Sequence, residues 1–170
     1  MLKLSKVERW LLANQYRILE IIDADSSEEY QISREILENG YEGEYEGISR
    51  EIYEGEDILN EKECDDVTYI LAMFSALKNS YTSLQDKTGI DEFSVTFQGF
   101  GGNDETKYLS YTRFICDKLD RFTGLNRGDN FNSHFPMLSA YLPMLAKWRA
   151  RKERYDLTKE DIVYITSRES

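Results

Sequence analysis

The sequence NEKECDDVTYILAMFSALKNSYTSL, residues 60–84, carries the strongest helical signal in the chain, because its apolar residues recur at intervals of three and four. Asn60 and Glu63 have the spacing of a capping box, which predicts that the helix begins beside Asn60. A helix of this length with one continuous apolar face predicts a helical core packed around it. That face comprises Cys64, Val67, Ile70, Leu71, Phe74, Leu77, Tyr81 and Leu84.

The opposite face of this helix carries small, mostly uncharged residues, whereas a solvated face usually carries Lys and Glu. Their spacing makes a shallow groove that lets a second helix approach to about 8 Å. Two readings stay open: the groove meets a symmetry-related copy, or it packs against another helix of the same chain, such as one over residues 104–121. Phe114, on the polar side of that helix, either contacts a partner or is covered by a loop of the same chain. The candidate interface is Ala72, Ser75, Ala76, Asn79 and Ser83, with Phe114.

Capping signals and apolar periodicity predict further helices on both sides of residues 60–84. The expected class is all-α: one compact multi-helical domain over residues 1–170, with about six to seven helices. Val95-Thr96-Phe97 alternates, which predicts one short extended segment near residues 93–98. The other predicted helices run from Ser5 to about Asp23, from Ser26 to Asn39-Gly40, over 104–121, from Ser133 to about Ala150, and onward from Thr158.

The negative charge of the chain is concentrated in one segment. The net charge is −11, and residues 25–66 alone hold 16 Asp and Glu against 3 Lys and Arg. The Tyr-Glu-Gly motifs of this segment lack the spacing of a calcium loop, so we interpret them as a solvated acidic connector. Basic residues cluster only over 147–154, at the end of a predicted helix, where they favour the helix dipole. We therefore expect nucleic acid to bind weakly at most.

The sequence favours a cytoplasmic location. No apolar run approaches the length of a membrane span, and the first residues lack the pattern of a secretory signal. Cys64 and Cys116 have neither metal-site spacing nor a disulfide framework, so we expect two reduced thiols on apolar helix faces. No cofactor and no metal is predicted.

Residues of catalytic type do not form a recognisable constellation in the sequence. His134 is the one histidine and has no Cys, Asp or second His at ligand spacing. Asn14 and Gln15 project into the apolar arc of the first predicted helix, and buried amides must find hydrogen-bond partners. They either hold a neighbouring loop or line a pocket with Phe97 and Phe100. The structural role is the expected one.

A further signal is a set of short strings spread over nearly the whole length of the chain. They are Asn14-Gln15-Tyr16, Leu84-Gln85-Asp86, residues 95–100 (VTFQGF), residues 108–114 (YLSYTRF), Phe131-Asn132, Pro136-Met137, Tyr141, Met144-Leu145 and Trp148. In this order the strings resemble the bacterial YfbU family. The resemblance implies a compact all-helical domain that associates with itself, without assigned enzymatic activity or catalytic residues. Some relatives carry a ribbon-helix-helix DNA-binding segment ahead of the domain; we expect none here, because Met1 stands close to the first helix.

The leading hypothesis is a self-associating cytoplasmic helical domain with an interaction or regulatory role, acting as a homo-oligomer or with another protein. It is expected not to be an enzyme and not to enter a membrane. One alternative is a small-molecule-binding or enzymatic domain with a pocket near Asn14, Gln15, Phe97 and Phe100. A second alternative is a nucleic-acid-associated regulator that uses residues 147–154.

Overall fold

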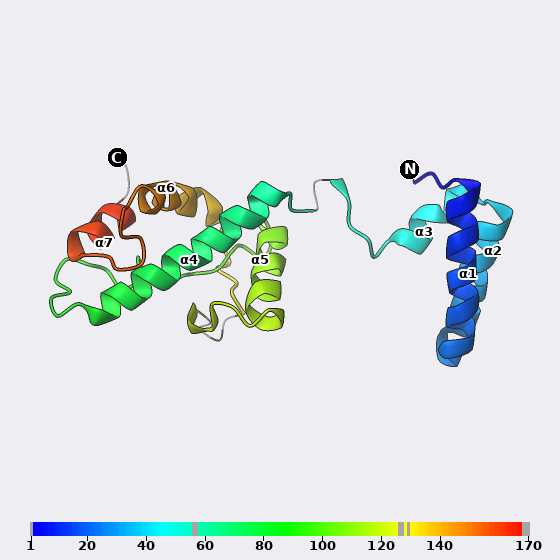
Figure 1. Ribbon diagram of the computed structural model, residues 1–170, viewed down its shortest axis with the longest axis horizontal. Helices are drawn as coiled ribbons and strands as arrows, with labels where there is room; N and C mark the ends of the chain where they lie inside the picture. Colours follow the sequence, from blue (N-terminus) through cyan, green and yellow to red (C-terminus); the bar gives the residue numbers. More distant parts are fainter. Residues whose placement is uncertain (1, 56–57, 126–127, 129, 168–170) are drawn as a thin grey trace. The chain divides into compact units, whose positions relative to one another are not determined.

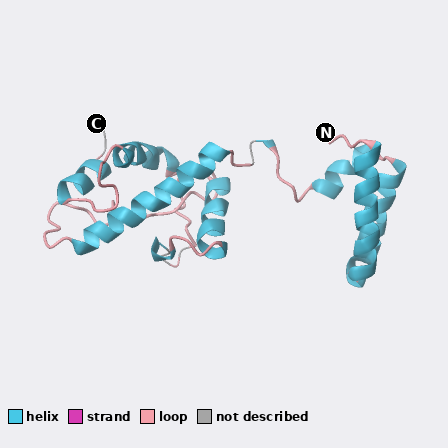
Figure 2. Cartoon of the chain, in the orientation of Figure 1, coloured by secondary structure: helices cyan, strands magenta, loops and turns pink. Residues whose placement is uncertain are grey.

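The computed structural model describes residues 2–55, 58–125, 128 and 130–167 (Figures 1 and 2). Over these ranges the chain contains seven α-helices and no β-strand, which confirms the all-α class. The helices group into two compact units, unit 1 (Met1–Gly55) and unit 2 (Glu56–Ser170). The single domain over residues 1–170 stays a prediction.

Unit 1 is a helical hairpin followed by one short helix. Helix α1 (Lys6–Ile22) packs against α2 (Ser27–Asn39), and α3 (Tyr45–Ser49) follows after a turn. The core of this unit is small, because the hairpin buries only one narrow side of α1. Its buried apolar residues are Ala13, Leu37 and Tyr45.

Local capping explains both ends of this hairpin. Ser5 and Glu8 form the predicted capping box: Glu8 N donates to Ser5 Oγ at 3.3 Å, and Ser5 N donates to Glu8 Oε2 at 2.7 Å. Helix α2 ends at Gly40, whose φ of +72° is the left-handed conformation that glycine adopts without strain. The boundaries predicted for both helices are therefore close to those observed.

Unit 2 is built around α4 (Glu61–Ser83), the helix predicted from residues 60–84. Three helices pack against it: α5 (Thr106–Arg113) beside its start, α6 (Leu138–Arg149), and α7 (Lys159–Thr166) toward its end (Figure 1). The predicted apolar face of α4 forms the centre of the core. Fully buried core residues include Val67, Ile70, Leu71, Leu77, Leu145, Trp148, Ile162 and Ile165.

The segment predicted to be extended is irregular. Residues 92–95 form a turn, and the described residues contain a single isolated β-bridge, between Phe100 and Asn132. Phe100 N donates to the carbonyl of Phe131 at 3.0 Å. The alternation that suggested a strand has another cause: Val95 and Phe97 are buried in the core while the residues between and after them are half-buried.

The helix predicted over residues 104–121 is shorter and ends differently. Helix α5 covers only Thr106–Arg113, and Asn103 does not cap it. After Arg113 the chain continues as a π-helical turn, Phe114–Lys118, and then reaches Asp120 with a φ of +53°. The left-handed conformation of Asp120 ends the helix. Nothing in the sequence indicated this end, because no glycine or proline lies there.

Helix α6 also begins later than predicted, and its cap comes from a distant residue. Met137 at its start makes no side-chain cap, and Ser133 instead donates to the carbonyl of Phe135. The buried carboxylate of Glu105 accepts from Met137 N at 2.9 Å, from Leu138 N at 2.7 Å and from Gly101 N at 2.9 Å. Glu105 thus satisfies amides that the first turn of a helix leaves unpaired.

Glu63 joins the start of α4 to α5. Its carboxylate accepts from Lys107 Nζ at 2.9 Å, from Asn60 N at 2.9 Å and from the hydroxyl of Tyr108 at 2.8 Å. The hydrogen bonds from Lys107, Asn60 and Tyr108 lower the pKa of Glu63 to about 2. Burial and the facing Glu63 carboxylate raise the pKa of Tyr108 to about 12. The folded state therefore favours ionised Glu63 and neutral Tyr108.

We expect Glu63→Gln to destabilise unit 2 at neutral pH and to have little effect in acid. A carboxyl with a depressed pKa in the folded state stabilises the fold above its unfolded value of 4.5 and loses that contribution as the pH falls toward 2. The test compares urea-unfolding midpoints of the two proteins between about pH 7 and about pH 2.5. The exposed neighbour Glu61→Gln serves as control. A difference between the original chain and Glu63→Gln that stays constant with pH would contradict the assignment.

Candidate functional site

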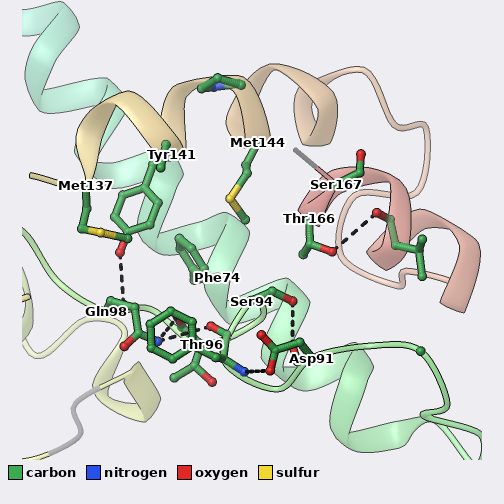
Figure 3. A pocket seen from close by; sticks show the side chains of 15 residues that line it. Phe74, Asp91, Ser94, Thr96, Gln98, Met137, Tyr141, Met144, Thr166 and Ser167 are labelled. Atoms are coloured by element: carbon green, nitrogen blue, oxygen red, sulfur yellow. Dashed lines mark hydrogen bonds between the residues drawn. The ribbon is translucent and has the colours of Figure 1, made fainter. Parts of the chain in front are cut away.

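A cavity of about 730 Å³ opens on unit 2 between α6, the end of α7 and the loop over residues 89–98 (Figure 3). This volume lies within the range of small-molecule sites. Phe74 of α4 and Tyr141 of α6 are buried at its back, and Met137 and Met144 line its α6 side. With Val163 of α7, these residues give the cavity an apolar wall formed by three helices.

The loop side of the cavity is polar, and its hydroxyl protons are directed into the chain. Ser94 Oγ donates to the carbonyl of Asp91 at 2.6 Å, and Thr96 Oγ1 donates to the carbonyl of Glu92 at 2.7 Å. Gln98 Nε2 donates to the carbonyl of Thr96 at 2.8 Å. Asp91 Oδ1 accepts from the amide of Phe93 at 3.1 Å. The loop thus presents oxygen lone pairs to the cavity.

The α7 side follows the same pattern. Thr166 Oγ1 donates to the carbonyl of Ile162 at 2.8 Å, and Ser167 Oγ donates to the carbonyl of Tyr164 at 2.8 Å. Lys147 Nζ donates to the carbonyl and hydroxyl oxygens of Ser167 at 2.8 and 3.0 Å. The ammonium of Lys147 is therefore engaged at the C-terminal end of α7.

Tyr141 joins the two walls of the cavity. Its hydroxyl accepts from the amide of Gln98 at 3.1 Å (Figure 3). The same hydroxyl donates to the carbonyl of Gly99 at 3.1 Å. Burial raises the pKa of Tyr141 above its ordinary value. The phenol stays neutral, and its two hydrogen bonds connect α6 to the loop.

The four residues of the predicted pocket belong to different units. Phe97 and Phe100 lie in the core of unit 2 with ring centroids 5.7 Å apart, behind the cavity wall. Asn14 is half-buried and Gln15 exposed on α1 of unit 1. The lining of the unit 2 cavity includes none of the four. Their role as a pocket stays a prediction, and the observed cavity was missed because its lining comes from four distant segments.

The small-residue face of α4 is only partly covered by its own unit. Ala76 is 2% exposed and belongs to the core of unit 2. At this position the groove is therefore filled by residues of the same chain. Ala72 and Ser75 are half-buried, whereas Asn79 and Ser83 are exposed. An intersubunit contact at these four positions stays a prediction.

Phe114, the sixth candidate interface residue, lies at the start of the π-helical turn after α5. It is 48% exposed, and its ring stacks on Tyr111 with centroids 6.3 Å apart. This intrachain stacking accounts for part of its surface. A contact of Phe114 with a partner stays a prediction.

A second candidate site is one side of α1, which we call the α1 face. Its large apolar side chains are each more than half exposed, and Asn14 lies among them, half-buried. The sequence placed these residues on one apolar arc, and the structure shows that only Ala13 of α1 is fully buried. The α1 face comprises Val7, Trp10, Leu11, Asn14, Ile18, Ile21 and Ile22.

The basic cluster at residues 147–154 is largely engaged within unit 2. Arg149 pairs with buried Asp66 at 3.2 Å, and Arg151 pairs with Asp161 at 3.2 Å. The guanidinium groups also lie over aromatic rings, Arg149 at 4.5 Å and Arg151 at 4.1 Å from the ring centroids. These contacts reduce the charge that the cluster offers to phosphate groups.

Metal-type and nucleophilic residues are dispersed. Among the residues that the structure describes, no three His, Cys, Asp or Glu side chains lie close enough to hold a metal ion. His134 is an exposed turn residue with a φ of +62°. Cys64 and Cys116 are free thiols, and burial raises the pKa of Cys116 to about 11, which keeps it protonated.

No helix in the described part of the chain is both long and apolar enough to cross a bilayer.

Comparison with known proteins confirms the predicted resemblance. The sequence matches the YfbU domain over residues 2–167. It is also 39% identical over 169 residues to the UPF0304 protein MJECS11 of Methanocaldococcus jannaschii, covering 95% of this chain and 98% of the relative. That relative is archaeal, so the likeness is not confined to bacteria. Both units, with the α1 face and the cavity, fall within the matched region, and the chain belongs to the YfbU domain family.

Proposed function

We propose that this chain is a self-associating helical domain with an interaction or regulatory role, and that it assembles through the α1 face. The observation that carries this proposal is the exposure of six large apolar side chains along one helix of 17 residues. A contiguous apolar patch of this kind marks an interaction surface, because leaving it in water is unfavourable.

The spacing on the α1 face favours a second copy of the same helix as the partner. Val7, Leu11, Asn14, Ile18 and Ile21 follow alternating steps of four and three, which is the spacing of a coiled-coil seam. A twofold axis would bring two identical seams together, and closed twofold pairs are the commonest soluble oligomers.

Asn14 supports the same arrangement. It is the single polar side chain on the seam, and a lone amide between apolar layers needs a hydrogen-bond partner. In a parallel pairing of two α1 helices, Asn14 meets the Asn14 of the second copy, and the two amides satisfy each other. A single Asn in this setting fixes the register of the two helices.

The cytoplasmic location and the absence of a nucleic-acid role are part of the same proposal. Two free thiols suit a reducing compartment. The engaged Arg149 and Arg151 and the net charge of −11 disfavour a polyanionic partner. If the partner is not a second copy of this chain, the proposal is that a different protein binds the α1 face.

The test is the mass of the Ile18→Glu variant in solution. We expect the unsubstituted chain to have at least twice its single-chain mass of 20.0 kDa at micromolar concentration. Glu at the centre of the seam places a charge in an apolar contact, so Ile18→Glu should sediment as a single folded chain. The measurements are analytical ultracentrifugation and the far-ultraviolet circular dichroism spectrum.

Ile52→Glu provides a matched control. Ile52 is 77% exposed and lies in unit 1 outside α1, so the same substitution there should leave the mass unchanged. The proposal fails if the unsubstituted chain is a monomer, or if Ile18→Glu keeps the oligomeric mass.

A further inference from the structure

The cavity of unit 2 offers hydrogen-bond acceptors and few donors. Ser94, Thr96 and Thr166 each donate their hydroxyl proton to a backbone carbonyl of the same chain. Gln98 Nε2 and the hydroxyl of Tyr141 likewise donate to backbone carbonyls, those of Thr96 and Gly99. A hydroxyl that donates inward still has lone pairs that face outward. The polar groups that line the cavity therefore suit a ligand that donates hydrogen bonds.

The charge at the cavity has one sign. Asp91 is the one carboxylate or cationic side chain among the lining residues. Its Oδ1 accepts from Phe93 N, whereas Oδ2 makes no hydrogen bond to a described residue. Lys147, which contacts the lining residue Ser167, donates from Nζ to the carbonyl and hydroxyl oxygens of that residue. A donor that carries positive charge makes a stronger hydrogen bond to a carboxylate than a neutral one does.

The remaining walls suit an apolar body. Met137 and Met144 are flexible and adapt to the shape of what they contact. The ring of Phe93, 61% exposed at the edge of the cavity, is available for stacking and for contact with a cation. Phe74 closes the back of the cavity.

From these features we propose that the cavity binds a small organic cation, an amine carried on an apolar or aromatic body. The ammonium donates to Asp91 and to the oxygen atoms of Ser94 and Thr96, and the body lies against Met144 and Phe93. The site lies wholly in unit 2 and does not depend on self-association through α1.

The experiment is a calorimetric titration at pH 7 with three indoles of similar size and different charge. Tryptamine is cationic, tryptophol is neutral and 3-indolepropionate is anionic. We expect tryptamine to bind most tightly and 3-indolepropionate most weakly. Asp91→Asn removes the charge but keeps the oxygen that accepts from Phe93 N, so the loop stays folded. This variant should weaken tryptamine binding about fivefold and bring it close to that of tryptophol.

Two further variants complete the test. Glu92→Gln removes the adjacent carboxylate, which lies outside the cavity lining, and should leave binding unchanged. Ala140→Trp fills the cavity and should abolish binding of all three indoles. The proposal is overturned if tryptamine gives no heat at millimolar concentration, if 3-indolepropionate binds as tightly, or if binding survives Ala140→Trp or is unaffected by Asp91→Asn.

Discussion

Gly99→Ala is expected to cost unit 2 more than about 4 kcal/mol, a large share of the free energy of unfolding of a typical domain. A Cβ atom at this position would lie 1.9 Å from the carbonyl oxygen of Phe131 and 2.4 Å from its carbon. These are backbone atoms, and they cannot move away without breaking the bridge between Phe100 and Asn132. The φ of +95° adds further strain for any residue with a side chain.

Chemical unfolding followed by circular dichroism measures this effect, and Gly89→Ala is the matched control. Gly89 has a similar φ of +82°, but an added Cβ meets nothing within 4 Å. It should therefore show only the backbone cost of about 1 kcal/mol. Equal stabilities of the two variants would mean that the close approach at Gly99 does not hold.

Glu105→Ala is expected to destabilise unit 2 by about 3 kcal/mol, because it leaves buried amides without an acceptor. The carboxylate caps the first turn of α6 through Met137 N and Leu138 N and also holds Gly101 N. Solvent cannot replace it freely, since the Glu105 residue is only 7% exposed.

The control for Glu105→Ala is Asp104→Ala, its exposed neighbour, which should change the unfolding free energy by less than about 0.5 kcal/mol. Glu105→Gln should fall between the two, because one amide oxygen remains as an acceptor. If Glu105→Ala and Asp104→Ala unfold at the same denaturant concentration, the cap contributes nothing.

The elements that the sequence predicted well are those whose signals are local. The capping box at Asn60 and Glu63 is present, and so is the one at Thr158 and Asp161. Both belong to residues three apart, so a single stretch of sequence contains all the interacting groups. The long apolar face of α4 became the core of unit 2 for the same reason.

The features that the sequence did not predict depend on contacts between distant residues. No side chain next to Leu138 caps the start of α6, because its cap is Glu105, 33 positions earlier. The cavity combines residues 89–98 with parts of α6 and α7, and no single stretch carries its pattern. On α1, an apolar arc looks the same whether it is buried inside a chain or between chains, so periodicity alone left that choice open.

The contrast between the two tryptophans of the chain has a practical consequence. Trp10 is 65% exposed on the α1 face, whereas Trp148 is fully buried in unit 2 and its Nε1 donates to the carbonyl of Arg154 at 2.6 Å. Indole fluorescence shifts with the polarity of its surroundings, so each unit carries its own optical reporter. In the unassociated chain, emission at long wavelength belongs to Trp10 and emission at short wavelength to Trp148. Assembly through the α1 face should shift the Trp10 emission to shorter wavelength, whereas unfolding of unit 2 should shift the Trp148 emission to longer wavelength, so the two events can be followed separately in one sample.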